Sequence, residues 1–374
     1  MRKIKNHLER AKDKRKMKNK IQKITPLPFV KNQGWAVNTV LFGDVMETLK
    51  KFPDESIDCV ITSPPYWQLR DYGWKGQWGL EKTYKEYLEH LWEFMNEAKR
   101  ILKNEGTVWI NLGDSYFGSG NGYGVKPEHM NLNPLNAAPK TPNDDKRNNL
   151  PRKGLSLIPQ RFAIGCIDRG WIVRNDIIWA KPNSLPESVT DRFAKKYEHI
   201  FFMVKNRDYY FDMDAIRDPY KHSSFDRVKY SMTAYGGDKN NTKGPFGKGA
   251  KNGATRKKIS LNPLGKNPGD VTDFWTISTR PNSQNHYAAF NGTLITKPIL
   301  AGCPKNGIVL DPFCGTGTTG ITAIELGRNF IGIEGKKEYA KMANQNIQKA
   351  LAKQDISMET LVRQLKNLSF SKVA

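Results

Sequence analysis

Short apolar runs alternate with segments of helical spacing over most of the chain. The runs Ile57–Ile61, Gly106–Leu112, Gly307–Leu310 and Asn329–Ile333 are typical of buried β-strands. Between two of these runs lies Tyr84–Leu102, in which the apolar residues recur at the spacing of a helix with one face toward the core. This strand–helix–strand order predicts an α/β protein with a mostly parallel, doubly wound sheet.

The same patterning predicts further elements along the chain. The expected strands are Trp35–Gly43, Trp171–Trp179 and Glu198–Val204, and the expected helices are Met46–Phe52, Ser156–Arg169 and Ile321–Leu326. At 374 residues the chain can bury one large core or two modest ones.

Two long polar stretches interrupt this rhythm. Gly118–Gly154 is rich in Gly, Asn, Pro and Lys, so it is expected to be a loop that contacts DNA or is disordered. Residues 206–272 mix Lys, Gly and Asn with aromatic residues. Basic and aromatic residues together suit phosphate contact plus stacking, which indicates a sequence-reading insertion. A flexible basic insertion without specificity is the alternative.

The formal net charge of +23 is concentrated in two segments. Residues 1–23 carry eleven Lys and Arg against two acids, and residues 221–266 carry the same numbers. Such basic attachments on a nearly balanced body indicate a polyanionic partner, with double-stranded DNA favoured. An anionic membrane is disfavoured because no stretch is apolar and long enough to span one. Residues 1–23 are either a solvated arm or an arm that follows DNA.

The cysteines lack the spacing of a metal site or a disulfide framework. Cys59, Cys166, Cys303 and Cys314 form no C-x-x-C pair, so we expect reduced thiols and no bound metal. The N-terminus is charged and has no apolar core after it, unlike a secretory signal. These features predict an intracellular, cytoplasmic protein.

A stiff turn follows the strand Ile57–Ile61. Ser63, Pro64, Pro65 and Tyr66 come directly after it, and two prolines can neither continue a strand ladder nor enter a helix. The turn offers a hydroxyl, proline carbonyls and an aromatic face at the carboxyl edge of the sheet. It therefore suits a flat heterocycle whose exocyclic amine donates to the Ser63 hydroxyl and the Pro64 carbonyl.

A second turn, rich in glycine, follows the strand Gly307–Leu310. The segment Asp311–Gly320 (DPFCGTGTTG) opens a helix, and the next strand ends in Glu334, nineteen residues after Gly315. Glycines let a ligand approach the backbone, and an acid at the end of the second strand can bind a ribose diol. The combination indicates an adenosine-type cofactor. It lacks the lysine of a P-loop and departs from the dinucleotide pattern G-x-G-x-x-G.

Asp44 follows Gly43 at the end of a predicted strand. Its carboxylate either faces a ligand at the sheet edge or caps the helix that follows.

These motifs resemble those of amino-group DNA methyltransferases. Thr62–Trp67 (TSPPYW) is similar to their catalytic motif (D/N/S)-P-P-(Y/F/W), and Asp311–Thr319 looks like their cofactor motif D-P-F-x-G-x-G-T-T. The catalytic motif precedes the cofactor motif, as in the permuted β-class. The resemblance covers about residues 36–112, 156–206 and 270–345, and implies a circularly permuted, Rossmann-like methyltransferase sheet.

The resemblance also implies a cofactor, S-adenosyl-L-methionine, and a set of site residues. Asp44 matches the acid that binds the cofactor adenine, and Glu334 the acid that binds its ribose. The other implied cofactor residues are Phe290, Asp311, Pro312, Phe313, Gly315, Thr316, Gly317 and Thr318, and the implied catalytic residues are Ser63, Pro64, Pro65 and Tyr66.

The implied reaction is methyl transfer to N4 of cytosine in duplex DNA, by base flipping and direct transfer. The serine before Pro-Pro favours cytosine, and N6 of adenine is the alternative. An RNA or protein substrate, or a non-catalytic nucleic-acid-binding role, is a more distant alternative. Cytosine C5 methylation is excluded because it requires a Pro-Cys dipeptide that the sequence lacks. A second copy in a homodimer and a cognate restriction endonuclease are candidate partners.

The chain is expected to divide into five parts. They are a basic arm (1–30), a catalytic part (31–205, with the loop 118–154), a target-recognition insertion (206–272), a cofactor-binding part (273–350) and a C-terminal helix or tail (351–374).

Overall fold

The computed structural model describes residues 36–74, 76–117, 146–184, 187, 189–220, 262–266, 273–279 and 292–370, the last fifteen of them by their backbone alone. Several sequence predictions lie outside these residues. They are the basic arm, residues 118–145 of the long loop, most of the insertion 206–272 and Phe290.

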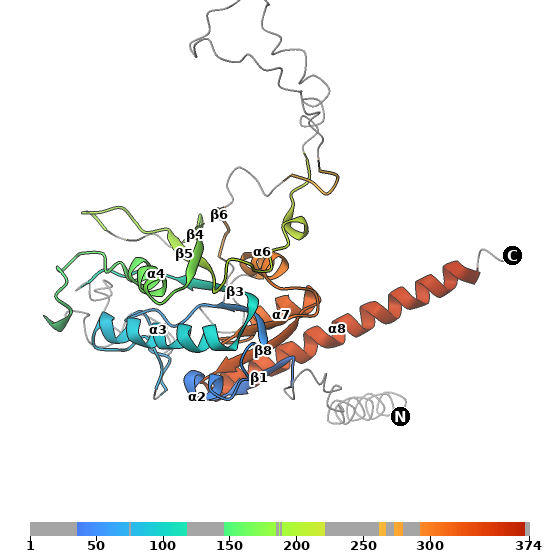
Figure 1. Cartoon of the computed structure of the whole chain (residues 1–374), viewed down its shortest axis with the longest axis horizontal. Helices are drawn as coiled ribbons and strands as arrows, with labels where there is room; N and C mark the ends of the chain where they lie inside the picture. The colour runs from blue at the N-terminus through green and yellow to red at the C-terminus, as the bar shows by residue number, and fades with distance from the viewer. Residues whose placement is uncertain are drawn as a thin grey trace, which may run out of the picture. The chain divides into compact units, whose positions relative to one another are not determined.

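Within the described residues, an eight-stranded sheet in the order β1-β8-β7-β2-β3-β5-β4-β6 carries the fold (Figure 1). The strands are β1 (Thr39–Phe42), β2 (Ile57–Thr62), β3 (Leu102–Leu112), β4 (Ile172–Ala180), β5 (Tyr197–Val204), β6 (Phe274–Thr276), β7 (Ile308–Asp311) and β8 (Asn329–Glu334). All neighbours are parallel except β5, which runs antiparallel to both β3 and β4. The predicted mostly parallel α/β sheet is confirmed, with β5 as its exception.

Helices pack on both faces of this sheet, as a doubly wound fold requires. They are α2 (Val45–Leu49), α3 (Tyr84–Ile101), α4 (Ile158–Asp168), α6 (Gly292–Gly302), α7 (Thr318–Glu325) and α8 (Lys337–Phe370). Contacts join α2, α3 and α4 in one group and α6, α7 and α8 in the other. The helix α8 continues across residue 350, where the sequence suggested a boundary.

Local signals explain where the helices begin. Thr83 caps α3 in a reciprocal capping box with Glu86. The helix α4 starts two residues later than predicted, because Leu157 is left-handed (φ 56°) and cannot continue a helix backwards. The side chain of Asp44 caps α2 by accepting from the Glu47 amide at 3.0 Å, so this helix begins before the predicted Met46.

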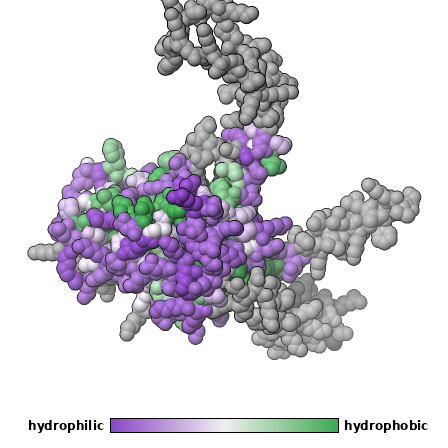
Figure 2. Space-filling model, viewed as in Figure 1, coloured by the Kyte–Doolittle hydropathy of each residue, from purple (hydrophilic) through white to green (hydrophobic). Residues whose placement is uncertain are grey.

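The core between the sheet and the second helix group joins distant parts of the sequence. Cys59 and Ile61 of β2 pack in one buried cluster with Ile299 of α6 and Ala343 of α8. Each large apolar side chain buried in such a cluster stabilises the fold by about 1.5–3 kcal/mol. Figure 2 shows that the face in view is mostly hydrophilic, apart from an apolar area on the side of α4.

The four cysteines are buried and form no disulfide. Burial raises the pKa of every one of these thiols, to about 12 for Cys59. Among the described residues, no helix is long and apolar enough to span a bilayer, and no cluster of His, Cys, Asp or Glu could hold a metal ion.

The two sequence motifs meet because β2 and β7 are neighbours in the sheet. Cys59 pairs with Val309 and Val60 with Leu310, both in parallel register. The turn after β2 and the turn after β7 therefore leave the sheet side by side at its carboxyl edge.

A buried carboxylate joins these two turns. The Thr62 hydroxyl donates to Asp311 Oδ1 at 2.6 Å, and the Thr319 hydroxyl donates to Oδ2 at 2.5 Å. The backbone N–H of Phe313 also donates to Oδ1, at 3.1 Å. Burial raises the pKa of Asp311 to about 6, although all three hydrogen bonds act to lower it. This carboxylate thus ties the end of β2 to β7 and α7.

We expect Thr62→Val to lower the free energy of unfolding by about 2 kcal/mol at pH 8, because a hydrogen bond to an ionised, buried carboxylate is lost. Thr322→Val is the matched control, since Thr322 lies in the same helix as Thr319 and donates to a neutral carbonyl. Its loss should be below about 1 kcal/mol in urea denaturation. Equal losses of stability in the two variants would contradict the conclusion that the hydrogen bond to the buried Asp311 carboxylate is stronger than one to a neutral carbonyl.

The loss of stability in Thr62→Val should depend on pH. The pKa of Asp311 is raised from 3.8 to about 6, so the folded protein binds this proton more tightly than the unfolded chain. The stability from this group therefore falls as the pH rises through that interval. At pH 5 the side chain of Asp311 is mostly neutral, and the Thr62→Val loss should be smaller than at pH 8.

Candidate active site

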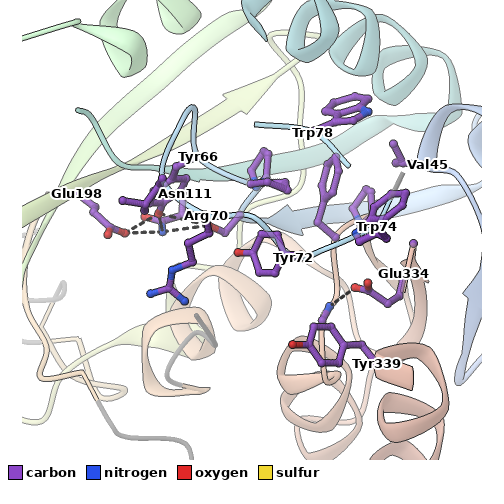
Figure 3. A pocket seen from close by; sticks show the side chains of 18 of the residues that line it. Val45, Tyr66, Arg70, Tyr72, Trp74, Trp78, Asn111, Glu198, Glu334 and Tyr339 are labelled. Carbon is purple, nitrogen blue, oxygen red and sulfur yellow. Dashed lines mark hydrogen bonds between the residues drawn. The ribbon is translucent and has the colours of Figure 1, made fainter. Parts of the chain in front are cut away.

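A pocket with a volume of about 250 Å³ opens at the carboxyl edge of the sheet, between the two turns. Figure 3 shows Tyr66, Asn111 and Glu198 on one side of it, and Glu334 and Tyr339 on the other. Among the site residues predicted from sequence, the pocket is lined by Asp44, Ser63, Pro64, Pro65, Tyr66, Pro312, Phe313, Gly315 and Glu334.

Apart from Phe290, which lies outside the described residues, the remaining predicted residues do not line the pocket. Asp311 and Thr316 are buried, and Thr318 is the first residue of α7. Gly317 is left-handed (φ 87°), and a Cβ there would lie 3.2 Å from the Cβ of Ala343. Its lack of a side chain thus permits α7 to pack against α8, whereas the sequence suggested a close approach to the ligand.

The turn Ser63–Tyr66 is fixed by the hydroxyl of Tyr66. This hydroxyl donates to Glu198 Oε2 at 2.6 Å, and it accepts from Asn111 Nδ2 at 2.6 Å and from the Ser63 hydroxyl at 3.3 Å. Its ring packs so tightly that a Cβ on Gly113 would lie 2.6 Å from it. Burial, followed by the charge of Glu198, raises the pKa of Tyr66 well above its usual value. Tyr66 is therefore held in one orientation as a neutral phenol.

A buried ion pair supports this arrangement. Lys181 Nζ contacts Glu198 Oε1, and both side chains are largely buried. Burial alone would raise the pKa of the Glu198 carboxyl, but Lys181 and the donors Tyr66 and Asn111 hold it below its usual value. The carboxylate is thus ionised at neutral pH.

Asn111, Lys181 and Glu198 were not predicted as site residues from the sequence. Asn111 is a polar residue in the otherwise apolar segment Val108–Leu112 at the carboxyl end of β3, which is a signal that could have been used. Glu198 lies near the start of β5, and in a parallel sheet that end would face away from the site. Because β5 is antiparallel, its start lies at the same edge as the ends of β3 and β4.

The opposite side of the pocket offers a carboxylate with fixed geometry. Glu334 Oε2 accepts from the Gly315 amide at 3.0 Å, and Oε1 accepts from the Lys336 amide at 2.8 Å. Burial raises the pKa of Glu334 to about 7 despite these two hydrogen bonds. Gly315 is left-handed (φ 53°), a conformation that favours glycine. The remaining lone pairs of Glu334 can accept from a ligand diol.

Aromatic side chains close the pocket between these two sides. They belong to the loop Asp71–Gly79, described apart from Lys75. Lys336 Nζ donates to the Tyr72 carbonyl at 3.0 Å, and a Cβ on Gly335 would lie 2.4 Å from the Trp74 ring. The aromatic loop is thus fixed on the segment that follows β8. Aromatic faces in this position suit a flat or cationic ligand.

Comparisons with known proteins assign the chain to a family. The family described as DNA methylase, N6_N4_Mtase, matches residues 57–345. The chain belongs to this family of amino-group DNA methylases.

Among curated relatives, the Type II methyltransferase M.SmaI of Serratia marcescens is 35% identical over 82% of this chain and 90% of its own length. M.Cfr9I of Citrobacter freundii is 34% identical over 83% of this chain and 87% of its own. A solved structure of the cytosine-N4-specific PvuII DNA methyltransferase has the same fold, with a TM-score of 0.52, 20% identity and coverage of 83% of this chain and 92% of that one.

The buried ion pair makes a stability prediction. We expect Glu198→Ala to lower the free energy of unfolding by about 3 kcal/mol, because it leaves the charge of Lys181 buried without its partner. Asp191→Ala is the control, since Asp191 pairs with Lys153 on the surface and exposed pairs contribute below about 1 kcal/mol. Urea denaturation at pH 7.5 compares them, and equal losses would contradict the importance of burial.

Proposed function

We propose that this protein is a site-specific DNA methyltransferase that transfers a methyl group to N4 of cytosine in duplex DNA. One observation carries the proposal: Ser63 and Pro64 line the same pocket as Gly315 and Glu334. A heterocyclic amine held by the first two residues therefore lies beside a cofactor held by the last two.

S-adenosyl-L-methionine, the methyl donor of this family, supplies an electrophilic methyl group on a sulfonium. The donor set fits such a molecule. Glu334 can accept from the ribose hydroxyls, and the Asp44 carboxylate, which caps α2 through Oδ1, can accept from the adenine amine. The aromatic loop presents ring faces that attract a cation.

Ser63 and Pro64 can make the amine of the target cytosine a better nucleophile. The lone pair of a cytosine amine is delocalised into the ring, so the amine is a poor nucleophile. A hydroxyl oxygen and a carbonyl oxygen that accept from its two N–H groups localise the lone pair on nitrogen and direct it at the methyl group. The base must leave the duplex to reach them, and stacking on Tyr66 offsets part of that cost.

The serine of the motif supports cytosine as the target, since acids and amides are commoner before Pro-Pro in enzymes of this family that methylate adenine. The adenine-N6 reaction is the second candidate, because the same two acceptors serve its amine equally well. Duplex DNA is the proposed substrate on account of the basic charge of the chain. A homodimer and a cognate restriction endonuclease stay proposals.

Mass spectrometry of nucleosides tests the reaction. Mixed genomic DNA is incubated with the protein and S-adenosyl-L-methionine labelled in its methyl group, because a mixed sample contains many candidate sites. We expect labelled N4-methylcytosine. Labelled N6-methyladenine would show that the target is adenine and not cytosine. An absence of label from both bases would contradict the proposal that the protein methylates DNA.

Cofactor binding should depend on the ionisation of Glu334. Only the ionised carboxylate accepts from both ribose hydroxyls, and its pKa is raised to about 7. The affinity for S-adenosyl-L-methionine should therefore fall about tenfold from pH 8 to pH 6. Calorimetry measures it, and Glu334→Gln is the control that corrects for titration of the cofactor itself. An equal pH dependence in both proteins would contradict the role of Glu334.

A further inference from the structure

We infer that Tyr66 and Glu198 carry away the proton that the target amine loses when it is methylated, through the chain Ser63 Oγ, Tyr66 Oη, Glu198 Oε2. This inference rests on the proposed function and adds a proton path to it. The observation behind it is a continuous set of hydrogen bonds that leads from the catalytic serine to a buried carboxylate.

Methyl transfer creates the need for such a path. The nitrogen forms a bond to the methyl carbon while the carbon–sulfur bond breaks, so nitrogen then carries a positive charge and one hydrogen too many. Of its two acceptors, the Pro64 carbonyl belongs to an amide and is too weakly basic to take a proton. The Ser63 hydroxyl can take one, provided that it releases its own at the same time.

The geometry shows where that hydrogen goes. The Ser63 hydroxyl donates to Tyr66 Oη at 3.3 Å, and the Tyr66 hydroxyl donates to Glu198 Oε2 at 2.6 Å. Every hydroxyl in the chain thus points toward the carboxylate. A proton from the amine enters at Ser63, the serine proton moves to Tyr66, and the tyrosine proton moves to Glu198. Each hydroxyl ends with one hydrogen, and the amine nitrogen recovers its lone pair.

The surroundings fix the direction of the chain. Asn111 Nδ2 donates both to Tyr66 Oη at 2.6 Å and to Glu198 Oε2 at 2.8 Å. Since a carboxylate only accepts, the amide of Asn111 cannot be flipped, and Asn111 offers Tyr66 no acceptor. Lys181 holds the other oxygen of Glu198 and keeps the carboxylate ionised before each turnover. Glu198 is therefore the end of the path, and it lines the pocket, where it can release the proton to water once product leaves.

Tyr66→Phe separates this role from stacking, because it removes the hydroxyl and retains the ring. We expect single-turnover methyl transfer, measured with mixed genomic DNA and labelled cofactor, to slow about 100-fold. The cofactor dissociation constant should change less than about twofold, because no cofactor contact is removed. Wild-type transfer should be slower in D₂O than in H₂O, and Tyr66→Phe should lose this solvent isotope effect.

Ser56→Ala is the control. It also removes a hydrogen-bonded hydroxyl, one that donates to the Pro53 carbonyl at 2.8 Å and does not line the pocket. Its transfer rate and isotope effect should equal those of the wild type.

A second variant tests the end of the path. Glu198→Gln combined with Lys181→Met removes the acceptor without leaving a lone buried charge, and it should show the same loss of rate and isotope effect. If a melting experiment shows that Tyr66→Phe does not fold, this double variant tests the proton path in its place.

Two results would overturn the inference. One is transfer by Tyr66→Phe within about threefold of the wild type, and the other is slower transfer with an unchanged solvent isotope effect, since the hydroxyl would then only orient the ring. An absence of label with the wild-type protein would instead refute the proposed function itself.

Discussion

The fold of this protein depends on one buried carboxylate that holds two distant parts of the chain together. Asp311 is only 1% exposed, and it receives hydrogen bonds from Thr62, Thr319 and the Phe313 amide. A carboxylate without a paired cation is costly to bury, so these donors must all be in place for it to be ionised. Because Thr62 directly precedes Ser63, the same contacts that satisfy Asp311 also set the position of the turn Ser63–Tyr66.

This arrangement explains how two motifs far apart in the sequence form a single site. The turn after β2 and the turn after β7 are almost 250 residues apart, yet the two strands pair in parallel register. The order in which the chain visits the strands does not affect the geometry at their carboxyl ends, provided that the same strands are neighbours. The antiparallel strand β5 then adds Glu198 to that edge from the other direction.

Much of this could be predicted from sequence, for a physical reason. The strands β2, β7 and β8 are mostly apolar. The turns after them contain residues with special backbone preferences: Pro64 and Pro65 restrict φ, and Gly315 can adopt the left-handed conformation. Such local constraints are visible in the sequence itself. The support of Tyr66 by Asn111, Lys181 and Glu198 was not predictable in this way. It depends on the direction of β5, which hydrophobic patterning does not encode, and on contacts between strands far apart in sequence.

The burial of every cysteine has a practical consequence. The thiolate is the reactive form of cysteine, and Cys59, Cys166, Cys303 and Cys314 all combine burial with a raised pKa. The folded protein therefore offers maleimide reagents no reactive thiol of its own. A single cysteine introduced at an exposed position, such as Ile164 on α4, would carry a fluorophore or spin label without competition from the native residues. The wild-type chain is thus already a suitable background for distance measurements by spectroscopy.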